Sequence, residues 1–99
     1  MSGSFDFMDK NVIGWGNRGW LDIIDFILEV CKTGSLKTHI MYKCNLNSKQ
    51  IAQYIEFLLN HRLIEDLAKA PSSSRVTYKT TESGKKYISA YKQLKDIFD

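Results

Sequence analysis

The chain has 99 residues, enough for one small domain, and 43% of them are hydrophobic, which supplies a modest core. It contains no run of about 18 apolar residues and opens with no basic-then-apolar leader, so we expect neither a membrane span nor a secretory signal. Its two cysteines, Cys31 and Cys44, form no CxxC pair and lie at no metal-ligand spacing from the histidines. We therefore expect an intracellular protein with two buried free thiols and no metal site.

The net charge is only +3, but two stretches of the chain contain seven of the 14 lysines and arginines and no acidic residue. The stretch from Val30 to Ile55 has no acidic residue and contains Lys32, Lys37, His39, Lys43 and Lys49. The stretch from Ala68 to Thr81 also lacks acids and contains Lys69, Arg75 and Lys79. Positive charge confined in this way is typical of a surface that binds a polyanion, although a solvated surface of mixed charge is the alternative.

The first part of the chain divides into an arm and a helix. Residues 1–17 are rich in Gly, Ser and Asp and have no sustained hydrophobic period, so we expect a flexible N-terminal arm. From Arg18 to Lys32, apolar residues recur at helical spacing and acidic residues fall on the other side, which predicts an amphipathic helix. Gly34 follows as a C-terminal stop signal.

Residues 37–62 have the pattern of two helices joined by a tight turn. The shorter helix begins between Ser35 and Thr38 and ends near Lys43, and Cys44–Asn47 forms the turn. Asn47 or Ser48 then caps a longer helix that reaches about His61, because a short side-chain acceptor satisfies a free backbone N–H there. The buried stripe of this helix is Ile51, Ile55, Leu58 and Leu59. This is the pattern of a helix-turn-helix, which a plain structural hairpin shares.

After the helices the period changes to that of strands. Leu63–Leu67 and the alternating Val76–Thr80 predict two strands, joined by a loop over Lys69–Arg75. Such a hairpin is marginal alone and must pack on the helices. Thr80 or Thr81 then caps a last helix that reaches Phe98, with an apolar stripe formed by Tyr87, Tyr91, Leu94 and Phe98. We expect this stripe to cover the first helix and to pair with a second copy.

The residues in this order resemble a known family. The matching segments are Ile24–Leu28, Lys37–Tyr42, Asn45–Ser48, Tyr54–Leu59, Leu63–Ile64 and Tyr78–Lys86. They are similar to the archaeal winged helix-turn-helix regulators, small dimeric DNA-binding proteins that include coiled-coil chromatin proteins. The last helix is shorter here than in the coiled-coil members, and the arm before Arg18 has no counterpart. The resemblance implies a DNA-binding homodimer that pairs through the last helix.

The predicted fold is therefore mainly α with a small β-hairpin, a winged helix-turn-helix. Its expected parts are the arm at 1–17, the winged domain at 18–80 and a dimerisation helix at 81–99. We find no catalytic constellation: the serines at 72–74 have no His-Asp partner, and Gly14-Trp15-Gly16 lacks the context of a phosphate loop. We expect no enzyme activity, no cofactor and no small-molecule substrate.

Double-stranded DNA is the expected partner, bound by two groups of residues. A recognition helix presents its outward N-terminal residues to base edges in the major groove, and glutamine can pair with adenine and lysine with guanine. Here these residues are Asn47, Ser48, Lys49, Gln50 and Gln53. Phosphate contacts are expected from Lys37, Thr38 and Lys43 and from Lys69, Ser73, Arg75 and Lys79 of the wing. Tyr54 fits the core better than a base contact, and His39 fits a surface position.

Three functions fit these observations. The first is a homodimeric regulator of transcription that reads sequence, the second is a nucleoid-associated architectural protein with little sequence preference, and the third is a winged helix used only to bind other proteins. A steep salt dependence of binding to DNA would exclude the third. A footprint on one site would separate the first from the second. The sequence leaves the target site and any effector open.

Overall fold

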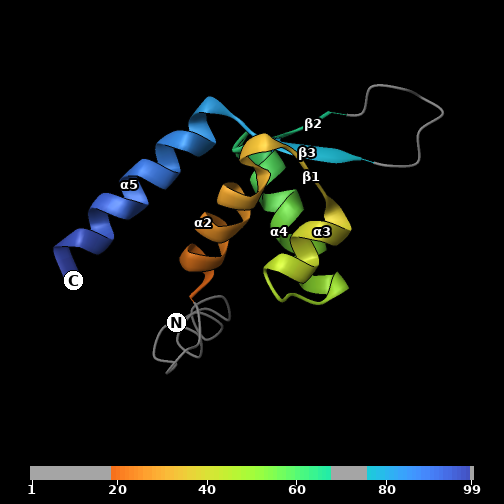
Figure 1. Ribbon diagram of the computed structural model, residues 1–99, viewed down its shortest axis with the longest axis horizontal. Coiled ribbons are helices and arrows are strands. Elements are labelled where there is room, and N and C mark those ends of the chain that lie inside the picture. The colour runs from red at the N-terminus through yellow and green to blue at the C-terminus, as the bar shows by residue number, and fades with distance from the viewer. Residues whose placement is uncertain (1–18, 68–75, 99) are drawn as a thin grey trace.

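The computed structural model describes residues 19–67 and 76–98. Its elements, in chain order, are α2 (Trp20–Val30), the 3-10 turn η1 (Cys31–Thr33), β1 (Ser35–Leu36), α3 (Lys37–Lys43), α4 (Ser48–Asn60), β2 (Ile64–Asp66), β3 (Thr77–Thr80) and α5 (Glu82–Phe98). Figure 1 shows α2 between α5 on one side and α3 and α4 on the other, with the β2–β3 hairpin projecting away from α5. The predicted mainly α fold with a small hairpin is confirmed, whereas the predicted arm at 1–17 lies outside the described residues.

The hairpin is part of a three-stranded antiparallel sheet with the order β1-β3-β2. Ser35 pairs with Tyr78 in β3, and Ile64 pairs with Thr80. The helix expected to begin between Ser35 and Thr38 is confirmed, since α3 begins at Lys37, but the sequence did not predict that Ser35 and Leu36 form β1. The reason lies in Gly34, whose φ of 95° turns the chain so that Ser35 is buried and its hydroxyl donates to the Val30 carbonyl.

The core lies between the helices α2, α3, α4 and α5 and the sheet. Its fully buried side chains are Ile24, Ile27, Leu28, Cys31, Ile40, Cys44, Ile51 and Leu58. Most of them come from the apolar faces of α2 and α4, while α3 contributes Ile40 and its C-cap residue Cys44, and α5 adds Ile88. Both cysteines are buried thiols outside any disulfide, as expected. Burial, followed by the neighbouring Cys44, raises the pKa of Cys31 to about 12, so the thiol stays protonated at neutral pH.

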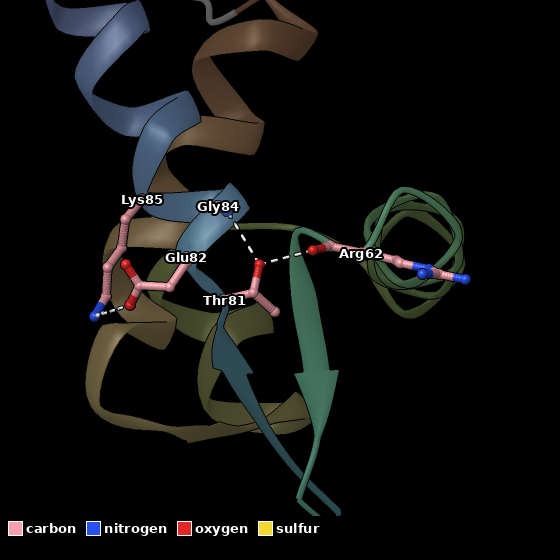
Figure 2. A network of polar contacts seen from close by, with 5 residues as sticks. All are labelled: Arg62, Thr81, Glu82, Gly84 and Lys85. Carbon is pink, nitrogen blue, oxygen red and sulfur yellow. Dashed lines mark hydrogen bonds and ion pairs between the residues drawn. The ribbon is translucent and has the colours of Figure 1, made fainter.

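The junction between α4 and α5 is held by backbone groups and by the hydroxyl of Thr81. α4 ends in a turn in which Arg62 adopts the left-handed conformation, with φ 59°, and Leu63 N–H donates to the Leu58 carbonyl at 2.9 Å. The Thr81 hydroxyl donates to the Arg62 carbonyl and accepts from the Gly84 N–H, so it caps α5, as the sequence predicted for Thr80 or Thr81 (Figure 2). A Cβ on Gly84 would overlap the Leu63 carbonyl oxygen. The start of α5 is therefore fixed directly against the end of α4.

Candidate nucleic-acid interface

The N-terminus of α4 is closed by two reciprocal hydrogen bonds. The Asn47 side-chain oxygen accepts the Gln50 N–H at 2.7 Å, and the Gln50 side-chain oxygen accepts the Asn47 N–H at 3.0 Å. Of the two predicted caps, Asn47 and Ser48, this capping box identifies Asn47, and it fixes where the helix starts. It also holds both side-chain oxygens on backbone N–H groups, so the NH₂ groups are the ends of these amides most available to a ligand.

The outer face of α4 is polar and exposed along its whole length. Its buried side consists of Ile51, Tyr54, Ile55 and Leu58, which places Tyr54 in the core as expected. The residues of the opposite, exposed side are Lys49, Ala52, Gln53, Glu56 and Asn60. In an α-helix, residues three and four positions apart lie on the same face. Lys49 and Gln53 are thus presented together, and Glu56 lies on the same face one turn further along.

α3, which packs against α4, also has an exposed polar side. Lys37, Thr38, His39, Tyr42 and Lys43 are all exposed, whereas Ile40 is fully buried. The turn to α4 is tight, because Asn45 adopts φ 56° and Leu46 N–H donates to the Met41 carbonyl at 2.9 Å. Sequence reasoning missed Tyr42, whose side chain is 78% exposed; an aromatic residue opposite the buried side of a predicted helix was the available signal.

The hairpin of β2 and β3, which is the wing of this fold, carries charges of both signs. Lys79 in β3 is exposed and lies directly opposite the exposed Glu65 of β2. The neighbouring acid, Asp66, is exposed as well and faces Tyr78, whose pKa is raised by burial and by that carboxylate. The other predicted wing contacts, Lys69, Ser73 and Arg75, lie outside the described residues. Strand β2 is thus acidic, whereas the acid-free stretch noted in the sequence begins only after it, at Ala68.

The predicted stripe of α5 divides into two halves. Tyr87 is partly buried: its hydroxyl donates to the Leu21 carbonyl at 2.9 Å and its ring stacks on Tyr91. Beyond Tyr91, Leu94 and Phe98 are 47% and 79% exposed, and together with Trp20 and Leu21 they line an open groove of about 280 Å³. Figure 1 shows this end of α5 leaning away from α2. The first half of the stripe therefore covers α2, and the second half has apolar surface in water.

Within 19–67 and 76–98, His, Cys, Asp and Glu form no group that could hold a metal ion. None of the helices described there is long and apolar enough to cross a membrane.

Two sequence comparisons relate the chain to known proteins. The sequence profile of the winged helix-turn-helix family matches residues 17–98. The uncharacterized protein MJ0287 of the archaeon Methanocaldococcus jannaschii is 31% identical over 83 residues, which cover 83% of this chain and 78% of the relative.

Three solved structures share the fold at low identity. The MepR–DNA complex of Staphylococcus aureus superposes with a TM-score of 0.66 at 15% identity, covering 96% of this chain and 74% of MepR. MarR of Listeria monocytogenes gives 0.58 at 18% identity, covering 96% of this chain and 69% of its own. NadR in complex with 4-hydroxyphenylacetate gives 0.51 at 13% identity, covering 97% and 70%. By the match along residues 17–98, the chain belongs to the winged helix-turn-helix family.

Proposed function

We propose that this protein binds double-stranded DNA and regulates transcription, with α4 inserted in the major groove. The observation that carries the proposal is the polar outer face of α4, together with the exposed basic residues of the adjoining α3. Lys37, Lys43 and Lys49 lie on this surface. The structure of MepR, which has the same fold and was solved as a complex with DNA, supports the proposal. Phosphate contacts supply affinity, and base contacts supply discrimination.

In this proposal the predicted contacts divide into those that read bases and those that bind phosphates. Lys49 and Gln53 read base edges, and Ser48 and the NH₂ groups of Asn47 and Gln50 donate to the groove beside them. Of the two glutamines, Gln53 is the better reader of adenine. Bidentate pairing needs a side-chain oxygen as well as the NH₂ group, and the Gln50 oxygen already accepts a backbone N–H. Phosphate contacts come from Lys37, Thr38, Lys43 and Lys79, and from Lys69, Ser73 and Arg75 of the loop.

The functional unit in this proposal is a homodimer that pairs through α5. Leu94 and Phe98 are the exposed apolar residues that pairing would bury, and Ile97, 74% exposed, adds to them. Tyr87 and Tyr91 lie at the inner end of the same stripe. A two-fold axis between the two paired α5 helices would place two α4 helices on one DNA duplex, which favours pseudo-palindromic sites with half-sites about one helical turn apart.

Titration with duplex DNA at several salt concentrations tests the proposal. Each phosphate contact contributes about 0.9 to the slope of log K against log salt, so Lys37→Ala with Lys43→Ala should flatten it by up to about two units. The matched control is Lys86→Ala with Lys92→Ala, which removes the same charge from exposed positions of α5. Equal effects of the two pairs would place the binding surface elsewhere. An unmodified protein without salt-dependent binding would rule out the proposal and favour a protein-interaction module.

A further inference from the structure

Glu56 lies in the middle of the outer face of α4, where the proposed DNA surface is otherwise neutral or basic. It follows Lys49 and Gln53 on that face and precedes Asn60, at spacings of four, three and four residues. Its side chain is exposed. A helix inserted in the major groove through Lys49 and Gln53 would carry this carboxylate into the groove with them.

The carboxylate has no evident part in holding the fold. Among the residues that the structure describes, the ion pairs are Lys32–Glu29 and Lys85–Glu82, so Glu56 has no cationic partner there. The positions three and four residues away are Ala52, Gln53, Leu59 and Asn60, none of which is basic. Glu56 also lies in the third turn of a 13-residue helix, beyond the first turn where a negative charge gains from the helix dipole.

The chemistry of the groove narrows what such a carboxylate can contact. An ionised carboxylate only accepts hydrogen bonds, and phosphate oxygens are negative acceptors too, so the backbone of DNA repels it. In the major groove, guanine and thymine present acceptors, and the amino group of adenine stands beside its N7 acceptor. The amino group of cytosine is the donor to which Glu and Asp pair.

We propose that Glu56 is a specificity-determining residue that accepts a hydrogen bond from the amino group of a cytosine. The rise from Gln53 to Glu56 along the helix is about 4.5 Å, close to the spacing of neighbouring base pairs. The adenine read by Gln53 and this cytosine therefore lie about one base pair apart. The inference rests on the proposed DNA binding and deepens it, because it makes the protein a reader of sequence and not an architectural protein.

Selection of bound duplexes from a random pool tests the inference, carried out with the unmodified protein, Glu56→Ala and Glu56→Gln at one stated salt concentration. We expect the unmodified protein to prefer cytosine about tenfold at one position of each half-site. Glu56→Ala should lose that preference alone, and Glu56→Gln should shift it to adenine, the base with which glutamine pairs. The matched control, Glu29→Gln on α2, removes the same charge outside α3, α4 and the wing and should select the same sites as the unmodified protein.

Other outcomes would overturn the inference in distinguishable ways. If the Glu56 variants bind every sequence more tightly by one factor, the carboxylate only repels phosphate. If they select the same sites as the unmodified protein, Glu56 does not contact the bases. If the unmodified protein binds all duplexes equally, DNA binding stands and sequence reading falls. An absence of salt-dependent binding to any duplex would overturn the inference and the proposed function together.

Discussion

Gly84 is the residue at which α5 approaches the end of α4 most closely. An added Cβ would overlap the Leu63 carbonyl oxygen and crowd the Thr80 methyl group, neither of which can move without disturbing the sheet. We expect Gly84→Ala to lower the free energy of unfolding by about 1–3 kcal/mol, although alanine is intrinsically the better helix former. Urea denaturation measures this change. Ser83→Ala, at the exposed neighbouring position, should be nearly neutral, and a stabilised Gly84→Ala variant would contradict the observed packing.

Tyr87 makes the stability of the protein sensitive to alkaline pH. Burial, helped by the charges of Asp25 and Asp22, raises the pKa of its hydroxyl above the ordinary value of 10.0. The folded state therefore keeps the proton more tightly than the unfolded chain, so the stabilisation is complete below pH 10 and is lost as the pH rises above it. Tyr87→Phe should be less stable at pH 7 by about 1 kcal/mol, for the lost hydrogen bond to Leu21.

The difference in stability between Tyr87→Phe and the unmodified protein should shrink between pH 10 and pH 11.5. Urea titrations of both proteins at each pH measure it, and the comparison cancels the other groups that titrate in this range. A difference that stays constant would mean that the Tyr87 hydroxyl ionises equally well in the folded and unfolded chains.

At the scale of elements, α4 contains two glutamines with different surroundings: Gln53 lies on the exposed outer face, and Gln50 belongs to the capping box. Gln53→Ala should cost about 1–3 kcal/mol on the preferred DNA site and little on random duplexes, because its amide is free to pair with a base. Gln50→Ala opens the capping box and should mainly lower the free energy of unfolding. Binding titrations on both kinds of duplex, together with urea denaturation, distinguish the two effects. Equal losses of Gln53→Ala on both duplexes would indicate a phosphate contact or no reading of sequence.

The sequence predicted elements well where a period or a cap signals them. The apolar stripes of α2 and α4, the Asn47 cap and the Thr81 cap were all recoverable from spacing and residue type. Strand β1 was not, because two residues show no period and its pairing with β3 depends on Gly34 and on segments about 40 residues apart. The left-handed turn at Arg62 was also missed, since glycine or asparagine usually occupies such a position.

The candidate interface was predictable only in part. Spacing within α4 placed Lys49 and Gln53 on one face, but the hydrogen bonds that occupy the Asn47 and Gln50 side chains became evident only in the structure. Glu56 was not among the predicted contacts, because it directly follows the acid-free stretch that ends at Ile55. The relation between Lys79 and Glu65 depends on the register of the hairpin, which composition does not determine.

For the whole molecule, the exposed end of α5 bears on assembly. Full burial of such a side chain is worth about 1.5–3 kcal/mol, so pairing of two copies would recover most of this for Phe98, which is 79% exposed, and about half for Leu94, which is 47% exposed. The double change Leu94→Glu with Phe98→Glu should give folded monomers that bind DNA much more weakly. Sedimentation and circular dichroism measure assembly and folding separately. If the unmodified protein is already monomeric at tens of micromolar, the dimer seam is wrong.

The central claim is that the DNA-binding surface is formed by α3, the turn and the outer face of α4. The most direct measurement is a titration of the protein with a short duplex at low salt, followed through its backbone amide NMR shifts. We expect saturable changes concentrated between Lys37 and Asn60 and around Lys79, which reverse as salt is raised. Changes confined to α2 and α5, or none at a duplex concentration that saturates related regulators, would contradict the account.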